Sequence, residues 1–361
     1  MRPLPFEEHY LGKRVLITGD TGFTGSWMVQ WLKSLGATIV GIALPPSSPD
    51  SLFAAAGAAA SIEHHDADIR DAAAMKRLIA AARPDFVFHL AAQALVRQSY
   101  RDPLETYSTN VMGTANVLDA CRGVPSLRAI IVITTDKVYH NNEWSWGYRE
   151  TDALGGKDPY SASKAACEFV VSSYRSSFFS NSSPPIPVAV ARAGNIVGGG
   201  DWAEDRIVVD IVRAIVDDSA LKLRNPRATR PWQHVLSACH GYLLLGAGLI
   251  EKPDAIEGAW NFGPEASETR SVAEVVEAFA EGWQRPNLRC EPSVLAEAGA
   301  LMIDSQRARQ LLGWKPAWQF EEVFRRTAQW YRGFCADRRG AAELCRDDIE
   351  AYRAVLADRL V

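Results

Sequence analysis

Tyr160 and Lys164 lie four residues apart in the segment PYSASK, residues 159–164. If this segment is helical, both side chains project from one face of the helix, one turn apart. A tyrosine hydroxyl ordinarily has a pKa of ~10, and an ammonium group close to it lowers that pKa. The pair is therefore suited to removing a proton from an alcohol. Such a pair also recurs by chance in helices, so its chemistry depends on the residues around it.

The N-terminal part of the chain contains a strand, a glycine-rich turn and a helix in succession. Residues 13–18 (KRVLIT) are typical of a buried parallel strand, the turn is GDTGFTG at 19–25, and apolar residues then recur with helical spacing up to Gly36. Such a unit brings backbone N–H groups and the positive end of a helix against a pyrophosphate. The glycine spacing is Gly-x-x-Gly-x-x-Gly. A plain tight turn is the alternative, but the position between a strand and a helix favours nucleotide binding.

The alternation of strands and helices then continues through the first 200 residues. Further strands are predicted near residues 38–42, 61–66, 85–92, 127–134 and 188–192, with helices at 71–82, 104–121 and 160–179. This order predicts an α/β fold, a Rossmann-type doubly wound parallel sheet with a smaller α/β substrate-binding domain. We assign residues 1–199 and 237–262 to the first domain and residues 200–236 and 263–361 to the second.

Polar and small residues follow several of the predicted strands. In doubly wound sheets, ligands bind beyond the carboxyl ends of the strands. The fold would therefore gather, on one edge of the sheet, residues that are far apart in the chain: Gly19, Asp68, Ala91, Ala92, Thr134, Thr135, Asp136 and Asn195.

The composition excludes several classes of function. Of the 361 residues, 47% are hydrophobic and 23% charged, and the formal net charge is -4, so neither nucleic acid nor an anionic membrane is an expected partner. Six dispersed cysteines have no metal-type spacing, so we expect reduced thiols and no metal site. Because no signal segment or membrane span is present, a cytoplasmic location is expected.

With these residues described, the chain resembles the extended short-chain dehydrogenase/reductase family. Within it, the chain is similar to the nucleotide-sugar 4,6-dehydratases that act on CDP-glucose. The resemblance covers about residues 11–330. It rests on GDTGFTGSW (19–27), TTDKVY (134–139), YSASK (160–164), ARAGN (191–195), GGGDW (198–202) and RPWQHV (230–235).

The resemblance implies three steps that use NAD as a regenerated cofactor. Tyr160 would take the proton of the C4 hydroxyl, with Lys164 lowering its pKa and holding the nicotinamide ribose and Thr135 hydrogen-bonding the reacting oxygen. Asp136 would protonate the departing C6 hydroxyl. Where this chain has Lys137, many 4,6-dehydratases have a glutamate that is the C5 base. Lys137 is therefore either that base or a charged residue that steadies the enolate or Asp136.

The resemblance also implies the residues that bind the cofactor and the CDP-sugar substrate. The cofactor would contact Gly19, Thr21, Gly22, Phe23, Thr24, Gly25, Asp68, Ile69, Leu90, Ala91, Ala92, Tyr160 and Lys164. The substrate would contact Arg192, Asn195, Trp202, Arg206, Arg230 and Gln233, with the arginines binding its phosphates. The second strand ends at residues 43–45 (ALP) with neither the acidic residue typical of NAD nor an arginine for a 2′-phosphate. The sequence around Gly299 and Ala300 lacks the bulkier side chains expected of the CDP-glucose enzymes.

Three alternatives remain open: a nucleotide-sugar 4-epimerase, a dehydratase of another nucleotide sugar, and a non-catalytic NAD-binding scaffold. His89 and His234 lie in apolar runs and are interpreted as core residues. Helices 104–121 and 159–179 have apolar residues on more than one face. One stripe would cover the sheet and the other would pair with a second subunit, so a homodimer or a higher homo-oligomer is predicted.

Overall fold

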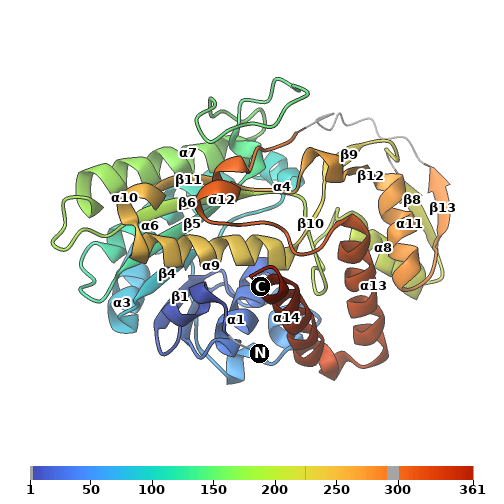
Figure 1. The fold of residues 1–361 in the computed structure, drawn as a ribbon, viewed down its shortest axis with the longest axis horizontal. Helices are drawn as coiled ribbons and strands as arrows, with labels where there is room; N and C mark the ends of the chain where they lie inside the picture. Colours follow the sequence, from blue (N-terminus) through green and yellow to red (C-terminus); the bar gives the residue numbers. More distant parts are fainter. Residues whose placement is uncertain (1–2, 224, 291–300, 361) are drawn as a thin grey trace.

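The computed structural model describes residues 3–223, 225–290 and 301–360, and a parallel sheet lies at its centre (Figure 1). The seven strands stand in the order β11-β6-β5-β4-β1-β2-β3. Their bounds are β1 Arg14–Thr18, β2 Thr38–Ala43, β3 Glu63–Asp66, β4 Phe86–His89, β5 Ala129–Thr135, β6 Val188–Ala193 and β11 Gly258–Phe262. Every pairing in this sheet is parallel, and the strand order reverses between β1 and β4. The predicted doubly wound α/β fold is confirmed.

Most of the strands are continuous apolar runs because both faces of the sheet are covered, whereas the edge strand β3 is polar (EHHD). In β1, Val15 and Ile17 belong to the core on one face, whereas Leu16 belongs to the core on the other. Figure 1 shows α3, α6 and α7 on one side of the sheet and α1, α9 and α14 on the other. These helices are α1 Phe23–Ser34, α3 Ala72–Ala82, α6 Gly113–Cys121, α7 Pro159–Tyr174, α9 Val235–Glu251 and α14 Ala341–Asp358.

The two long helices predicted beside the sheet each contain a π-helical turn. The first runs through α5 (Pro103–Tyr107), a π turn (Ser108–Met112) and α6, and α7 continues into a π turn at Arg175–Phe179. Asn110 lies in the first π turn, accepts a hydrogen bond from the Gln93 N–H and donates one to the Ser163 hydroxyl. This turn therefore ties the helix to α7 and to the segment after β4.

The smaller domain contains short strands and three longer helices. They are α8 Ile207–Val216, β8 Ala220–Leu223, β9 Thr229–Pro231, β12 Thr269–Ser271, α11 Val272–Gly282, β13 Asn287–Cys290 and α13 Phe320–Ala336. β13 pairs with β8 in parallel, β12 pairs with β9 antiparallel, and α11 packs on α13. Short connecting elements are α2 Leu52–Ala55, α4 Val96–Arg101, β7 Ile196–Val197, β10 Gln233–His234, α10 Pro253–Ile256 and α12 Gln306–Leu311.

The last helix contacts elements of both predicted domains. We assigned residues 263–361 to the smaller domain, and α14 packs on α13 of that domain as well as on α1 and α2 of the larger one. Tyr352 of α14 contacts the Trp31 ring, and Arg353 forms an ion pair with Glu7. Aromatic side chains of the larger domain therefore pack against the apolar face of α14. The sequence of the helix alone does not predict which element covers that face.

Candidate active site

The glycine-rich turn joins β1 to α1 through closely packed backbone. Gly19 has a φ of 78°, and its N–H donates to the Ile42 carbonyl at 2.8 Å. A Cβ added to Gly25 would lie 2.1 Å from the Gly19 carbonyl oxygen, and one added to Gly19 would lie 2.7 Å from the Ala91 nitrogen. Glycine is therefore required at both positions. The absence of side chains leaves the N-terminus of α1 open at the switch point of the sheet, which fits a dinucleotide pyrophosphate.

The other residues predicted to contact the cofactor lie at the same edge of the sheet. The Leu90 N–H donates to the Thr18 carbonyl, so the segment after β4, which includes Ala92, lies against the glycine turn. The Thr21 hydroxyl donates to the Leu44 carbonyl at the end of β2. Phe23 and Thr24 are half-buried in the first turn of α1. The site residues so far described share one edge, as predicted.

Asp68 and Ile69 follow β3. Ile69 is buried against Gly113, whose added Cβ would lie 2.5 Å from the Ile69 side chain. The Asp68 carboxylate accepts hydrogen bonds from the Arg70 backbone and guanidinium, and the hydrogen bonds from Arg70 lower the pKa of Asp68. An adenine-lining role for Asp68 would therefore involve a carboxylate that Arg70 already holds in place.

The predicted base lies on α7, whose N-terminus is capped by Asp158. Tyr160 is buried, and its hydroxyl hydrogen-bonds the Thr135 side chain. Lys164 lies one turn further along the same helix and donates to the Ile133 carbonyl in β5 at 3.1 Å. The structure thus brings the end of β5 and the first two turns of α7 together.

The expected lowering of the Tyr160 pKa does not occur in this structure. Burial raises the pKa of Tyr160 to about 12, and the Thr135 hydrogen bond and the Arg206 charge offset only part of that effect. Burial also lowers the pKa of Lys164. Desolvation of the hydroxyl therefore outweighs the positive charge of Arg206, and the four-residue spacing alone does not reveal how deeply Tyr160 is buried.

Asp136 follows Thr135 and is buried. Its carboxylate accepts a hydrogen bond from the Thr135 hydroxyl at 2.9 Å and one from the Asn195 amide at 3.4 Å, and it lies 3.6 Å from the Lys137 ammonium. Thr135 has one hydroxyl hydrogen, which serves either Asp136 or Tyr160 at a given moment. One hydroxyl therefore connects the predicted base to the predicted acid.

Arg192 does not lie where a substrate phosphate would reach it. Its guanidinium is buried and donates to Glu168 at 2.9 Å and to the Tyr139 hydroxyl at 2.6 Å. Glu168 also accepts a hydrogen bond from the Thr134 hydroxyl at 2.8 Å. The prediction that Arg192 binds substrate is therefore not supported. The sequence analysis missed Glu168, although it lies on the same face of α7 as Tyr160 and Lys164.

Removing one partner of this buried pair should destabilise the protein strongly. We expect Glu168→Ala to lower the free energy of unfolding by ~3–5 kcal/mol, because the Arg192 guanidinium would remain buried without its counter-charge. Urea unfolding of the wild type and the variant measures this. The double variant Glu168→Leu, Arg192→Met is the control and should be closer to the wild type. A single variant no less stable than the double one would contradict the prediction.

Gln233 and Trp202 are also committed mainly to internal contacts. The Gln233 amide donates to the Gly194 and Phe262 carbonyls, so it is not available as the predicted donor to substrate. Its Oε1 is buried without a hydrogen-bond partner. Trp202 packs on the Tyr331 and Phe334 rings of α13. His89 and His234 are buried, and their interpretation as core residues is confirmed.

Two of the predicted arginines lie nearer to solvent. Arg206 immediately precedes α8, its side chain is 47% exposed, and its charge acts on Tyr160. Arg230 lies in β9, directly opposite Arg270 of β12. Like charges on paired strand positions repel each other, and Glu274 offsets part of the Arg270 charge, with its Oε1 3.7 Å from Arg270 Nε. The sequence analysis missed Arg270 because only strand pairing places it beside Arg230. Gly299 and Ala300 lie outside the described residues.

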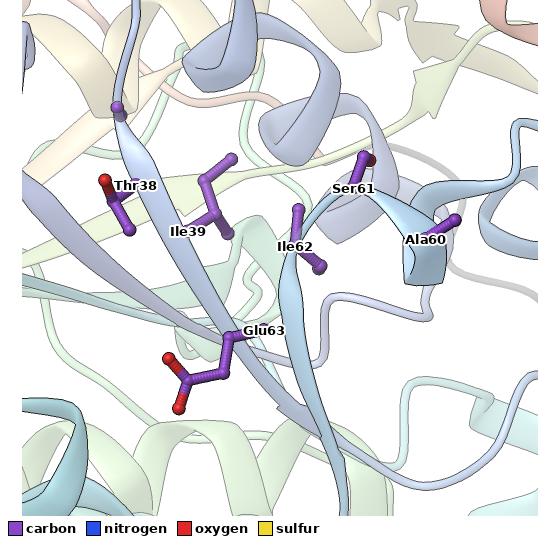
Figure 2. Close-up of a pocket in the computed structure, with 7 residues that line it drawn as sticks. Thr38, Ile39, Ala60, Ser61, Ile62 and Glu63 are labelled. Carbon is purple, nitrogen blue, oxygen red and sulfur yellow. The ribbon is translucent and has the colours of Figure 1, made fainter.

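A pocket of about 360 Å³ lies between β2 and β3 (Figure 2). Thr38 is the first residue of β2 and Glu63 the first of β3, so the pocket is at the amino-terminal ends of these strands. The catalytic candidates follow the carboxyl ends, so this pocket is separate from them.

Within the described ranges, no group of three or more His, Cys, Asp or Glu residues is arranged to hold a metal ion. No helix there is long and apolar enough to cross a bilayer.

Comparisons with known proteins agree with this geometry. A profile of the family described as GDP-mannose 4,6 dehydratase matches residues 16–327. CDP-glucose 4,6-dehydratase from Salmonella typhimurium is 41% identical over 328 residues, 90% of this chain and 91% of the relative. dTDP-glucose 4,6-dehydratase from Xanthomonas campestris pv. campestris is 27% identical over 337 residues, 88% of this chain and 92% of the relative.

A solved structure also shares the fold. UDP-glucose 4-epimerase from Thermus thermophilus, in complex with NAD, has a TM-score of 0.75 at 26% identity and covers 89% of this chain and 99% of its own. The profile and the Salmonella relative each span most of the chain. The chain therefore belongs to the GDP-mannose 4,6 dehydratase family of nucleotide-sugar dehydratases.

Proposed function

We propose that the protein is an NAD-dependent hydro-lyase that converts CDP-D-glucose to CDP-4-keto-6-deoxy-D-glucose. The observation that supports this most is that Tyr160 and Asp136 contact the same Thr135 hydroxyl. A base and an acid joined in this way suit a reaction that deprotonates one hydroxyl and protonates another. The 41% identity with the Salmonella CDP-glucose enzyme supports the choice of substrate.

In the first step, Tyr160 takes the proton of the C4 hydroxyl. Thr135 hydrogen-bonds the reacting oxygen, and Lys164 holds the nicotinamide ribose. Because burial raises the pKa of Tyr160 to about 12, Thr135 and Arg206 are needed to stabilise the tyrosinate. NAD, when bound, supplies the hydride acceptor for C4, later returns the hydride to C6, and adds a positive ring charge near the base.

In the second step, the C4 ketone acidifies the hydrogen on C5, and water leaves across C5 and C6. Asp136 gives a proton to the departing C6 hydroxyl, which requires its carboxyl group to be in the protonated form at this step. Lys137 either removes the C5 proton or remains an ammonium that steadies the enolate and Asp136. A proton returns to C5 when C6 has been reduced, which completes the 4-keto-6-deoxy sugar.

The diphosphate of the substrate would be bound by guanidinium groups, which match its geometry. Arg206, Arg230 and Arg270 are the candidates, and Asn195 is placed to hydrogen-bond the sugar beside Asp136. We do not include Arg192 in this set, because Glu168 and Tyr139 occupy its guanidinium. A 4-epimerase shares the fold, but that reaction has no use for an acid at the position of Asp136.

Proton NMR of CDP-glucose incubated with the protein and NAD in deuterated water tests the proposal. We expect a 6-deoxy-4-keto sugar that carries deuterium at C5, which reports oxidation, elimination and reprotonation together. Turnover of a different nucleotide sugar instead would support the dehydration reaction and exclude CDP-glucose as the substrate. Epimerised product without loss of water would overturn the dehydratase assignment.

The same experiment with Lys137→Ala tests the C5 base. If Lys137 only steadies its neighbours, elimination should slow while deuterium still enters C5. If it is the base, the variant should accumulate the 4-keto sugar with hydrogen retained at C5. Lys137→Arg separates the two further, because arginine keeps the charge and does not act as a base at neutral pH.

We also propose a homodimer that pairs the outer faces of the helices beside the sheet. Large apolar side chains are exposed there on α4, α5, the following π turn and α7: Tyr100, Leu104, Tyr107, Met112 and Phe169. The α5 and α6 segments both pack on α7, so these side chains belong to one helical layer. Light scattering at micromolar concentration should give twice the chain mass. Phe169→Glu should give a monomer, whereas Leu311→Glu, at an exposed position on α12, should not; a monomeric wild type would refute the proposal.

A cytoplasmic location and a role in deoxysugar synthesis, including that of O-antigen sugars, complete the proposal. The cysteines whose side chains the structure describes are free thiols, and four of the five are buried. Free thiols are the common state in reducing compartments. Cell fractionation that found the protein in an oxidising compartment would contradict this location.

A further inference from the structure

The end of β2 lacks the carboxylate that commonly recognises the adenosine ribose of NAD. In dinucleotide-binding folds, an acidic residue about 20 residues after the glycine turn hydrogen-bonds the ribose 2′-hydroxyl. Here β2 ends at Ala43, and Leu44 and Pro45 follow. If NAD is the cofactor, as the proposed function requires, some other group must act on that hydroxyl.

Asp66 lies beside this position on the neighbouring strand. In the parallel pairing of β2 and β3, Asp66 is the register partner of Ala43. Paired residues of adjacent strands project from the same face of a sheet. The Asp66 side chain is 62% exposed at the carboxyl end of β3. The Asp66 carboxylate is therefore one strand away from the usual position of the acidic residue at the end of β2. It lies on the same face of the sheet and in register with Ala43.

His64 holds Asp66 in position. Its Nε2 lies 3.1 Å from Asp66 Oδ1, and its Nδ1 lies 2.7 Å from Asp20 Oδ2. The two ring nitrogens therefore link the two acids through one side chain. The ring also packs against Phe53, with centroids 4.9 Å apart.

Asp20 anchors this arrangement inside the glycine-rich turn. Its side chain is fully buried, and Oδ1 has no hydrogen-bond partner. The neighbouring residue on β2 is Gly41, where an added Cβ would lie 2.0 Å from Asp20 Oδ2. Glycine at 41 thus makes room for the carboxylate. Burial raises the pKa of Asp20, which disfavours a negative charge beside the place where an anionic pyrophosphate would bind.

The nearby arginine is already engaged. Arg70 donates to the Asp68 carboxylate through Nε at 2.8 Å and through Nη2 at 2.6 Å. A 2′-phosphate is commonly accommodated by an arginine in this region. The groups at the ends of β2 and β3 therefore favour a free ribose hydroxyl over a phosphate.

We propose that Asp66, positioned by the chain Asp20–His64–Asp66, recognises the adenosine ribose and selects NAD over NADP. The hydrogen-bond acceptor for the ribose 2′-hydroxyl, which a residue at the end of β2 usually supplies, is supplied by β3 instead. The Asp66 carboxylate accepts a hydrogen bond from the ribose hydroxyl, and it repels a phosphate in the same place. This assigns a role in cofactor selection to a residue outside the set that the sequence resemblance implied.

Calorimetric titration of the nucleotide-free protein with NAD and with NADP, without any sugar, tests the proposal. We expect Asp66→Asn to weaken NAD binding by ~10-fold or more, the effect of a hydrogen bond to a charged group. The same variant should bind NADP as well as or better than the wild type does. The matched control is Glu63→Gln, which changes the same charge at the opposite end of β3 (Figure 2). The control should leave both affinities unchanged.

Three results would overturn the proposal: an unchanged NAD to NADP ratio in Asp66→Asn, an equal effect of Glu63→Gln, or a wild type that prefers NADP. Thermal unfolding of each variant shows whether a lost affinity reflects lost structure. His64→Gln is the second variant, because a single side-chain amide does not reproduce both ring contacts, and it should weaken NAD binding as well. A wild type that selects NAD and converts no nucleotide sugar would remove the proposed reaction and leave this inference standing.

Discussion

Tyr160→Phe is expected to lower kcat by about 10²–10⁴-fold, the range for loss of a general acid or base. The variant keeps the buried ring and loses only the hydroxyl that contacts Thr135. NAD binding should therefore persist while the C4 hydroxyl loses its proton acceptor. Steady-state turnover of CDP-glucose, followed by product NMR, gives kcat, and titration with NAD gives the affinity.

A matched control is Tyr174→Phe at the last residue of α7, which should leave kcat unchanged. The pH profile adds a second readout. Because burial raises the pKa of Tyr160 to about 12 in the ligand-free protein, the deprotonated base is scarce at low pH and kcat/KM should rise as pH increases. That rise should be absent in Tyr160→Phe. A variant that retains more than a tenth of kcat would exclude Tyr160 as the base.

Asp136→Asn is expected to separate oxidation from elimination. Asparagine keeps an oxygen that accepts from Thr135, but it has no proton to give to the C6 hydroxyl. Loss of water should slow by about 10²–10⁴-fold while oxidation at C4 continues. Reduced nicotinamide and a 4-keto sugar that retains its C6 oxygen should then accumulate, measured by near-ultraviolet absorbance and by NMR.

The control for this variant is Asp119→Asn, an exposed carboxylate on α6 that forms an ion pair with Arg122. It should turn over like the wild type. Normal yields of the 6-deoxy product from Asp136→Asn, without accumulation of reduced cofactor, would show that another group protonates the leaving hydroxyl. Loss of oxidation in the same variant would show that Asp136 acts already in the first step.

Local pattern was sufficient to predict six of the seven strands of the sheet and the helix that carries Tyr160 and Lys164. β1 and β5 are apolar on both faces, which is the signature of strands covered on both sides, and Gly19 to Gly25 lie between a strand and a helix. The spacing of Tyr160 and Lys164 needs only one helix to be correct. These features depend on residues that are close together in the chain.

Features that depend on distant partners were not predicted. Arg192 was assigned to the substrate because its motif matched, but its guanidinium is already hydrogen-bonded to the buried carboxylate of Glu168. Arg270 was missed because antiparallel pairing with β9 decides its position. The Tyr160 pKa was expected to fall, since spacing shows the neighbouring charge but not the depth of burial. In each case, long-range packing decided the outcome.

The buried contact between Glu168 and Arg192 also fixes the rotation of α7 about its own axis. Tyr160, Lys164 and Glu168 follow one another on a single face of that helix, and Glu168 binds β6 through Arg192 and β5 through Thr134. A rotation by one residue, about 100°, would carry the Glu168 carboxylate away from both Arg192 and Thr134. The resulting unpaired charges would cost ~3–5 kcal/mol. The helix therefore has one preferred orientation. The contacts of Glu168, about two turns along α7 from Tyr160, thereby set the direction of the Tyr160 hydroxyl.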